Sequence, residues 1–336
     1  MLYVGLDIHS KHITLCVLDQ SGQIFRRSRV RTIEEMMRIL ERLPDRFEVC
    51  YEASCGYGTY HDLLRPLASR VAVAHPGHLK WIFRSRLKND RRDAEKLAKL
   101  LYLGEVPAVH VPTPEVRAWR ELITCRQRLV DKRTKAKDQL RALLRSSVIA
   151  PPKGTTLWTR RGIAWLRGLE LPSTSGALRR DLLLAEIEAL NGQMRRLDAE
   201  LDRLADHGPG VQLVRSIPGV GPRTAEAVVA FLDDPGRFPN SKAVGRYFGL
   251  IPSQDRSGTS NRLGHITREG SATVRRLLTE AAWQAIHRSP TVRSYYERVR
   301  RDDRDRTRIA IVATAHYLAR VIYAMLRHGT TWQEAA

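Results

Sequence analysis

A seven-residue apolar repeat in the middle of the chain constrains the fold more than any other feature of the sequence. Residues 177–206 have a helical pattern in which apolar side chains recur at spacings of four and three. The repeating residues are Leu183, Ile187, Leu190, Met194, Leu197, Leu201 and Leu204. Such a seam over three heptads is typical of a coiled-coil helix, which must bury this stripe against another helix. We therefore expect a long helix with a helical partner.

A second long helix, predicted over residues 115–145, offers that partner. Its apolar residues at 122, 129, 136 and 143 also recur every seven residues, and a Pro-Pro-Lys-Gly sequence at 151–154 ends the segment. The two helices form either an antiparallel arm or a surface for dimerisation, because packing within one chain and packing between chains bury the same face. Between residues 117 and 145, ten Lys or Arg oppose three acids, which favours contact with a nucleic-acid backbone over a merely solvated surface.

The N-terminal third has a different pattern, in which strands come first and helices then alternate with strands. Strands are predicted over residues 2–8, 12–19, 23–30, 47–51 and 71–74, and helices over 32–43, 60–68, 78–86 and 93–103. Three meandering strands followed by alternating helix and strand predict an α/β domain with a mixed sheet, in a ribonuclease-H-like strand order.

Four acidic residues lie where such a domain forms its sites. Asp7 ends the first strand, Glu52 ends the fourth, and Asp90 and Asp93 begin a late helix, one turn apart. Sites in α/β sheets form beyond strand ends and at helix starts, so these carboxylates can converge. Oxygen ligands with open coordination positions suit magnesium ions that act on a phosphodiester. The alternative for Asp90 and Asp93 is an ordinary helix N-terminus, where Asp is common.

The charge of the chain indicates a polyanionic partner. Lys and Arg number 57 against 36 Asp and Glu, which gives a net charge of +21. Nucleic acid is favoured over a membrane, and no apolar run approaches the roughly 20 residues of a spanning helix. Three cations, Lys88, Arg91 and Arg92, surround the acidic pair and are expected to contact nucleic acid. Four cysteines without a CxxC pair predict reduced thiols in a cytosolic protein.

Two segments of the C-terminal third carry further candidates. Residues 211–225 resemble a helix-hairpin-helix element, in which Gly219 and Gly221 would let backbone amides approach a phosphate; the alternative is an ordinary helical corner.

Residues 247–270 are expected to form a long polar loop. In that loop Ser257 is a candidate nucleophile, although a serine in a loop is more often a turn residue. Nearby cations would bind nucleic acid and stabilise a transferring phosphoryl group; they are Arg256, Arg262, His265 and Arg268. Helices are predicted over 272–287, 290–301 and 307–327.

Together these motifs resemble the DEDD-type transposases of the IS110 insertion-sequence family, including its IS1111 group, from end to end. The N-terminal resemblance lies in Gly5-Leu6-Asp7, Tyr51-Glu52-Ala53-Ser54 and Lys88-Asn89-Asp90-Arg91-Arg92-Asp93-Ala94. The C-terminal resemblance lies in Ser216-Ile217-Pro218-Gly219-Val220-Gly221, Phe248-Gly249-Leu250-Ile251-Pro252, Ser257-Gly258 and Gly264-His265-Ile266-Thr267. Other acids, Glu95 and Glu105, lie near the first set, and other hydroxyls, Ser253, Thr259 and Ser260, lie near Ser257.

The resemblance implies a fold that is α/β plus all-α, in three domains. A RuvC-like domain would span residues 1–110, a basic coiled-coil arm 111–207, and a helical transposase domain 208–336. It implies that Asp7, Glu52, Asp90 and Asp93 bind Mg²⁺, and that Ser257 attacks DNA and becomes linked to the 5′ phosphate. It also implies donor and target DNA, a structured noncoding guide RNA, and a homo-oligomer, dimer or tetramer, with sites shared between subunits.

The resulting expectation is a DNA transposase that moves an insertion sequence in the bacterial cytoplasm, associated with the nucleoid and with no membrane partner. One alternative is a metal-dependent nuclease that resolves four-way junctions by water attack and needs no serine. Another is a non-catalytic nucleic-acid-binding protein with degenerate acids. Backbone affinity without base-reading motifs is what a guided protein requires, and this chain has no obvious base-reading motif.

Overall fold

The computed structural model describes residues 1–82, 90–206, 208–257 and 260–334. Within these ranges it does not describe the side chains at 81–82, 90–91, 209, 256–257 and 260–261. The chain divides into two compact units, Met1–Arg117 and Ala118–Ala336. The division into three domains stays a prediction.

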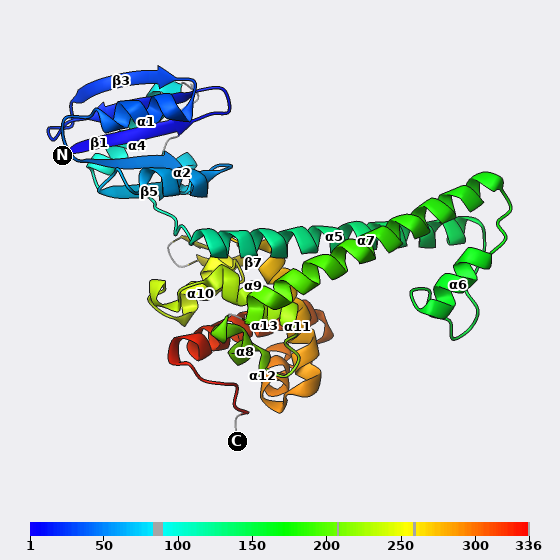
Figure 1. The fold of residues 1–336 in the computed structure, drawn as a ribbon. Coiled ribbons are helices and arrows are strands. Elements are labelled where there is room, and N and C mark those ends of the chain that lie inside the picture. The colour runs from blue at the N-terminus through cyan, green and yellow to red at the C-terminus, as the bar shows by residue number, and fades with distance from the viewer. Residues whose placement is uncertain (83–89, 207, 258–259, 335–336) are drawn as a thin grey trace. The chain divides into compact units, whose positions relative to one another are not determined.

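The first unit is built on a five-stranded mixed sheet (Figure 1). The strands are β1 (Leu2–Ile8), β2 (Ile13–Leu18), β3 (Ile24–Val30), β4 (Phe47–Glu52) and β5 (Arg70–Ala74). Their order is β3-β2-β1-β4-β5; β2 is antiparallel to both of its neighbours, whereas β4 is parallel to β1 and β5. The carboxyl ends of β1, β4 and β5 therefore meet at one edge. This mixed α/β arrangement is consistent with the predicted ribonuclease-H-like domain.

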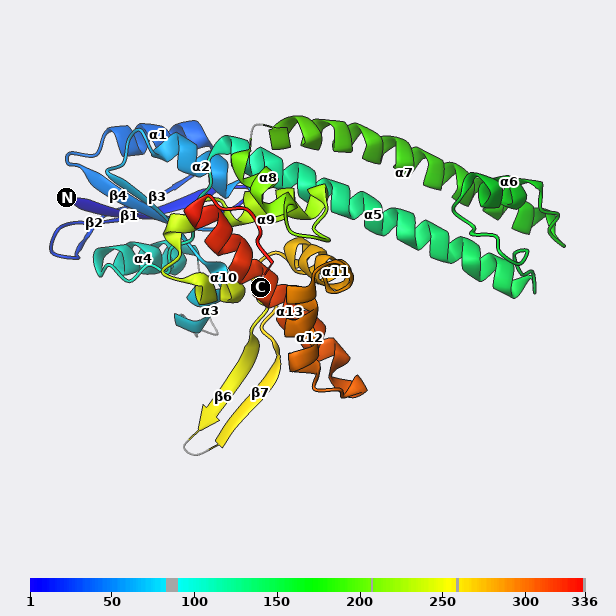
Figure 2. The ribbon, with the colours of Figure 1, turned by 90° about the horizontal axis from the view of Figure 1, so that it is seen from below.

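Helices cover both faces of this sheet (Figure 2). They are α1 (Ile33–Glu41), α2 (Tyr57–Leu64), α3 (Pro76–Ile82) and α4 (Asp90–Tyr102). Successive residues of a strand point to opposite faces, so β1 serves two cores. Val4 and Leu6 pack with Met36 of α1, whereas Tyr3, on the other face, packs its ring edge-to-face with Tyr102 of α4 at 5.3 Å. The predicted cap of α1 is confirmed, because the Thr32 side chain accepts a hydrogen bond from the Glu35 amide.

Helix α4 lies directly on β1, and Gly5 makes this close contact possible. A Cβ added at Gly5 would overlap the Ala94 carbonyl oxygen and lie 2.5 Å from the Ala98 amide nitrogen. Both alanines are completely buried. Ala94 therefore lies over the middle of β1, and the preceding turn of α4 reaches toward the carboxyl end of that strand.

Substituting Gly5→Ala is expected to destabilise the protein by about 2–3 kcal/mol, because overpacking at a backbone contact forces α4 away from the sheet. Thermal or urea unfolding of the purified protein measures this change. Gly168→Ala is the matched control, since an added Cβ there meets no heavy atom within 4 Å. Equal stability of the Gly5→Ala and Gly168→Ala proteins would contradict the described packing.

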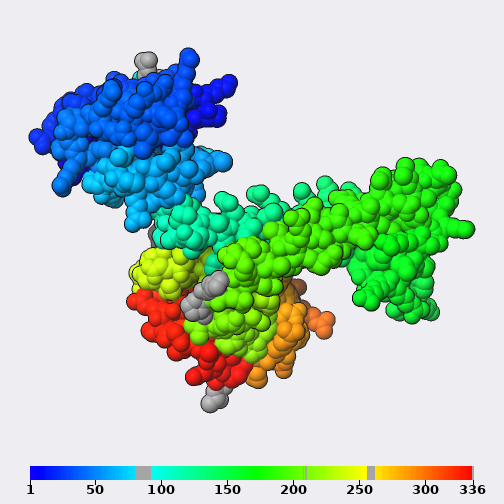
Figure 3. All heavy atoms as spheres, in the orientation of Figure 1, coloured from blue at the N-terminus to red at the C-terminus, as the bar shows by residue number. Residues whose placement is uncertain are grey.

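The second unit begins with an antiparallel helix pair. Helix α5 (Pro114–Ser146) and α7 (Thr174–Asp206) run beside each other, with α6 (Arg160–Gly168) at their far end (Figures 1 and 3). Near that end, Leu143 of α5 packs with Leu183 of α7. Further along, Leu129 of α5 packs with Met194 of α7. The apolar seam is thus covered within one chain, so it no longer argues for dimerisation.

A helical body completes the second unit. Its elements are α8 (Pro209–Arg215), α9 (Pro222–Leu232), the short 3-10 helices η1 (Pro235–Arg237) and η2 (Arg304–Arg306), α10 (Ser241–Tyr247), α11 (Ala272–Arg288), α12 (Pro290–Arg300) and α13 (Thr307–His328). The helix α13 is long and apolar enough to cross a membrane. However, Ile311, Leu318 and Ile322 lie in the largest apolar core of the unit. We therefore explain α13 as the central core helix of this body.

The polar segment 247–270 is not the loop that the sequence predicted. It contains an antiparallel hairpin of β6 (Pro252–Ser257) and β7 (Ser260–Ile266), which extends away from the helices (Figure 2). The described residues of both strands are almost all exposed on either face. A hairpin that buries neither face needs no alternation of apolar and polar residues, so the usual sequence signal for strands is absent.

A buried acid lies where the helical body meets the helix pair. Glu226 of α9 is only 1% exposed. Arg223, one turn earlier, approaches its carboxylate at 3.1 Å and also pairs with Asp198 and Asp202 of α7. Burial outweighs the attraction of Arg223 and raises the pKa of Glu226 to about 7.

This acid predicts a stability that decreases as pH rises. The folded state holds a proton that the unfolded chain loses near pH 4.5, so the stabilisation is complete below that pH and is lost as pH rises through about 7. We expect Glu226→Gln to raise the free energy of unfolding by about 2–3 kcal/mol near pH 8 and to change it little near pH 5. Urea unfolding at the two pH values measures this. Glu186→Gln, exposed on α7, is the control; a pH dependence that survives in Glu226→Gln would contradict the assignment.

Candidate functional site

Two of the four predicted acids share one face and one edge of the sheet. Leu6 of β1 is the partner of Tyr51 of β4, so the next residues in these parallel strands, Asp7 and Glu52, lie side by side. Asp7 is two residues from Gly5 and therefore points to the same face, the one that α4 covers. Glu52 shares this face with Cys50, which packs in the core beneath α4. The two carboxylates thus project from adjacent strand ends toward the same layer.

The other two acids lie in the first turns of α4. The helix begins at Asp90 and runs opposite to β1, because Ala94 and Ala98 contact Gly5 and Tyr102 contacts Tyr3. Its first turn therefore faces the edge that bears Asp7. The Asp93 side chain is 32% exposed. The side chain of Asp90 lies outside the described residues.

Two partners of these acids were missed by sequence reasoning. The His9 imidazole lies 3.1 Å from the Asp7 carboxylate, and its ring lies 5.1 Å from that of His12. The Lys96 ammonium donates to Asp93 at 2.9 Å. The signals were present, since His9 follows Asp7 by two residues and Lys96 follows Asp93 by one helical turn. Contacts this close would hold the two carboxylates in a fixed orientation.

The donor chemistry of this face fits a divalent cation. Carboxylate oxygens are the ligands that Mg²⁺ prefers. Among the side chains that the structure describes, no three Asp, Glu, His or Cys groups gather closely enough to hold a metal ion. The neighbouring acid Glu95 is engaged elsewhere, because it pairs with Arg27 at 2.5 Å and Lys99 at 2.7 Å; these contacts lower its pKa.

Ser257 lies in the second unit, at the turn end of the β6–β7 hairpin. It is the last residue of β6 and is the ladder partner of Ser260. Arg256 precedes it, but the side chains of Arg256 and Ser257 are outside the described set. The predicted cations Arg262 and His265 are exposed on β7, and Arg262 is the ladder partner of Asp255. The hairpin thus presents Ser257 on an accessible ribbon and away from the helical core.

The remaining cations that the sequence predicted to bind nucleic acid differ in how much of them the structure describes. Lys88 lies outside the described residues, and Arg91 is placed in α4 without its side chain. Arg92 is exposed on the first turn of α4. Beyond the hairpin, Arg268 is exposed and has a positive φ of 57°.

The two glycines of the predicted helix-hairpin-helix differ from each other. Gly219 has a φ of +94°, and a Cβ there would lie 2.6 Å from the backbone nitrogen of Ala285 in α11. Packing on α11 therefore explains this glycine without a ligand. Gly221 caps α9 and faces open space, so it is the better candidate for approach to a phosphate.

Comparison with known proteins shows that both units resemble transposases. Residues 4–149 match the DEDD transposase family of IS110, and residues 211–297 match the transposase IS116/IS110/IS902 family. The transposase of insertion sequence IS1111A from Coxiella burnetii is 26% identical over 98% of this chain and 91% of its own length. The transposase of IS1328 from Yersinia enterocolitica is 26% identical over 98% of both chains. An uncharacterized protein of insertion element IS110 from Streptomyces coelicolor is 32% identical over 45% of this chain and 37% of its own length.

Proposed function

Because the chain belongs to the IS110 family of insertion-sequence transposases, we propose that it cuts and rejoins DNA through a covalent phosphoserine intermediate. The observation that carries the proposal is the pair of carboxylates, Asp7 and Glu52, at adjacent parallel strand ends beneath the start of α4. The face that bears them and Ser257 lie in different compact units. The reaction therefore needs both units to meet on one phosphate, within a chain or between chains.

In this proposal Asp7, Glu52, Asp90 and Asp93 hold magnesium at the edge of the sheet. When bound, the metal polarises the phosphodiester and neutralises charge that develops during displacement. The chain's own contribution is orientation. His9 and Lys96 contact two of the carboxylates and fix their direction, and the buried contact of α4 on Gly5 holds the helix start over the strand ends.

The covalent step is assigned to Ser257. Its Oγ forms a bond to phosphorus, the bond between phosphorus and the 3′ oxygen breaks, and the serine proton is transferred to the departing 3′ oxygen or to solvent. A 3′ hydroxyl of another strand then attacks the phosphoserine, which restores the serine and rejoins the DNA. No energy source is consumed, because each phosphodiester is replaced by an equivalent ester. Arg256, Arg262, His265 and Arg268 supply positive charge near the transferred phosphoryl group.

The partners in the proposal are donor and target DNA, a structured noncoding guide RNA and further copies of the chain. The charge of +21 supports polyanionic partners. Exposed cations on the hairpin and on the first turn of α4 support contact through the nucleic-acid backbone. The oligomer, dimer or tetramer, is proposed because Ser257 and the acidic set lie in separate units. Such a protein works beside the nucleoid in the bacterial cytoplasm.

The test is a search for protein-linked DNA on a nicked suicide substrate that carries an end of the element. The proposed reaction leaves a labelled strand attached to protein on a denaturing gel, and protease treatment releases it. A metal-dependent junction nuclease that uses water would leave free ends and no attached strand. A non-catalytic binding protein would leave the DNA intact. Omission of Mg²⁺ is expected to abolish the adduct while binding persists.

A further inference from the structure

A row of polar side chains continues from Asp7 toward the edge of the sheet. Asp7 is the ladder partner of Thr14 on β2, and Thr14 is the partner of Arg29 on β3. Side chains of directly opposed residues lie on the same face. The row Asp7, Thr14, Arg29 therefore runs across three strands on the face that α4 covers. It joins the acidic edge to a strand rich in arginine.

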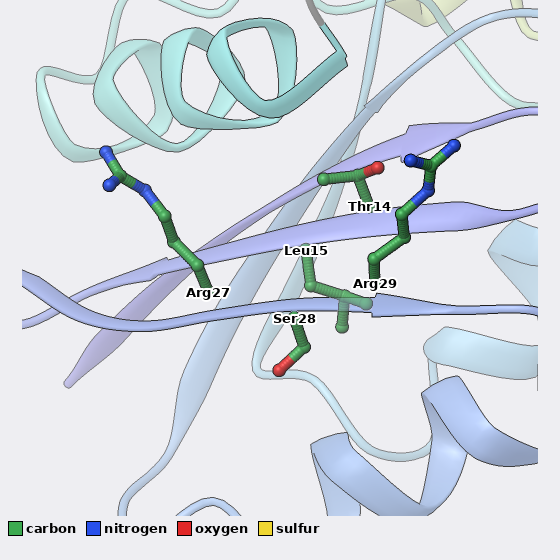
Figure 4. Close-up of a pocket in the computed structure, with 5 residues that line it drawn as sticks. All are labelled: Thr14, Leu15, Arg27, Ser28 and Arg29. Atoms are coloured by element: carbon green, nitrogen blue, oxygen red, sulfur yellow. The ribbon is translucent and has the colours of Figure 1, made fainter.

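A cavity of about 310 Å³ lies on this row, lined by Thr14, Leu15, Arg27, Ser28 and Arg29. In Figure 4 the side chains of Thr14, Arg27 and Arg29 project from one side of the strands, and Ser28 points to the other side. Thr14 and Arg29 are ladder partners on neighbouring strands. The polar groups of this wall are thus one hydroxyl and two guanidinium groups.

The hydroxyl of Thr14 is the group that needs an explanation. Thr14 is 4% exposed, and its Oγ1 has no hydrogen-bond partner among the residues that the structure describes. A buried hydroxyl without a partner costs about 1–3 kcal/mol, and valine would fill the same volume without that cost. Along β2 the next two residues on this face are apolar, since Cys16 and Leu18 pack against Ala94 and Ala98 of α4. A ligand in the cavity would supply the missing partner.

The charges that line the cavity select an anion. The described residues that line the cavity include two arginines and no acid, and Arg27 is paired with Glu95 at 2.5 Å. Arg29 approaches both ring nitrogens of His12, at 3.0 and 3.1 Å. That contact is weak compared with a bidentate pair between a guanidinium and a phosphate. The Arg29 side chain is exposed, so it can exchange the imidazole for a stronger acceptor.

We propose that this cavity binds a backbone phosphate of the DNA strand, close to and distinct from the phosphate processed at Asp7. Arg29 contacts the phosphate oxygens, and the Thr14 hydroxyl donates to one of them. Adjacent strands lie about 4.8 Å apart, so Arg29 is about 10 Å from Asp7 along the row, a distance that one strand of DNA spans within a few nucleotides. The inference rests on the proposed function, because it assumes that DNA lies across the acidic edge.

The alternative role of Arg29 is to keep an edge strand soluble, since β3 ends the sheet and charged side chains there prevent pairing with other chains. Arg26 of the same strand offers a matched control. It is the partner of Val17, on the opposite face, and is equally exposed. If the arginines only keep the edge strand soluble, replacing Arg26 or Arg29 should have the same effect, whereas the proposed subsite includes Arg29 and not Arg26.

The experiment measures equilibrium binding of a fluorescein-labelled, mixed-sequence single-stranded oligonucleotide across a salt series. Arg29→Gln is expected to weaken binding and to reduce the slope of log K against log salt by about 0.7, the value for one phosphate on a single strand. Thr14→Val is expected to weaken binding about tenfold with the slope unchanged, because it removes one neutral donor to a charged group. Its melting temperature should be equal to or above that of the wild type. Arg26→Gln should change neither the affinity nor the slope.

A second arm titrates inorganic phosphate alone into the wild type and the same three variants. If phosphate binding changes while oligonucleotide binding does not, the site takes a free anion and the inference is overturned. If the wild type binds DNA and neither Thr14→Val nor Arg29→Gln changes that affinity, the subsite is overturned and the proposed function is unaffected. If the wild type binds no DNA at all, both the subsite and the proposed function are contradicted.

Discussion

Replacing Ser257 by alanine should abolish the protein–DNA adduct and reduce strand transfer by at least about 10³-fold. The hydroxyl is the only atom of this side chain that can bond to phosphorus, and water cannot replace it because hydrolysis does not rejoin strands. The substitution should not affect folding, since Ser257 lies at the turn of an exposed hairpin. The measurement is denaturing electrophoresis of a labelled suicide substrate, with circular dichroism to verify the fold.

Two hydroxyls in the same hairpin serve as controls. Ser253 of β6 is exposed, and Ser260 of β7 is the ladder partner of Ser257. Ser253→Ala and Ser260→Ala should both retain the adduct. If the adduct persists in Ser257→Ala and disappears in Ser260→Ala, the nucleophile is Ser260 and not Ser257. Free ends from the wild type would favour the junction nuclease instead.

Replacing Asp7 by asparagine should reduce DNA cleavage by about 10³-fold or more while leaving DNA affinity equal to or above that of the wild type. Asparagine keeps the shape of the side chain but removes the charge that binds a cation, and a bound cation contributes several kcal/mol to displacement at phosphorus. When binding is measured without Mg²⁺, loss of a negative charge near a phosphate only removes repulsion of the strand. Cleavage in Mg²⁺ and binding by fluorescence anisotropy, measured on one preparation, separate these effects.

The control for Asp7→Asn is an acid at the opposite edge of the same sheet. Asp45 precedes the start of β4 and pairs with the N-terminal amine, far along the strands from the carboxyl ends. Asp45→Asn should cut DNA at the wild-type rate. Full cleavage by Asp7→Asn would contradict the metal assignment and would favour a protein whose acids serve only to cap and solvate.

Most elements of the fold could be predicted because their periodicity is strong. The first strand was predicted at its observed bounds, and the two long helices were predicted within a few residues of theirs. The hairpin of β6 and β7 could not be predicted in this way. A strand that buries one face has alternating apolar residues, whereas the described residues of this ribbon are exposed on both faces. Helix α10 was also missed, because seven residues are too few for a clear helical period.

The candidate site was only partly predictable. Acids at strand ends and at a helix start are visible in sequence, and their sharing of one face was a reasonable expectation. Their neighbours were less visible, because His9, Lys96, Thr14 and Arg29 are ordinary residues until the strands are paired. Thr14 in particular is a common strand residue, and only its burial without a partner draws attention to it.

The sequence alone determined which segments bury which faces, since apolar periodicity and turn residues are local properties. It therefore determined the mixed sheet, the two long helices and the positions of Asp7 and Glu52 at strand ends. Only the tertiary structure decided which residues of neighbouring strands and helices lie opposite one another. The register of β1 against β2 and β3 aligns Asp7, Thr14 and Arg29, and the absence of a side chain at Gly5 sets α4 over the acidic edge. Strand register and close backbone contact depend on residues distant in the chain, so local periodicity could not reveal them.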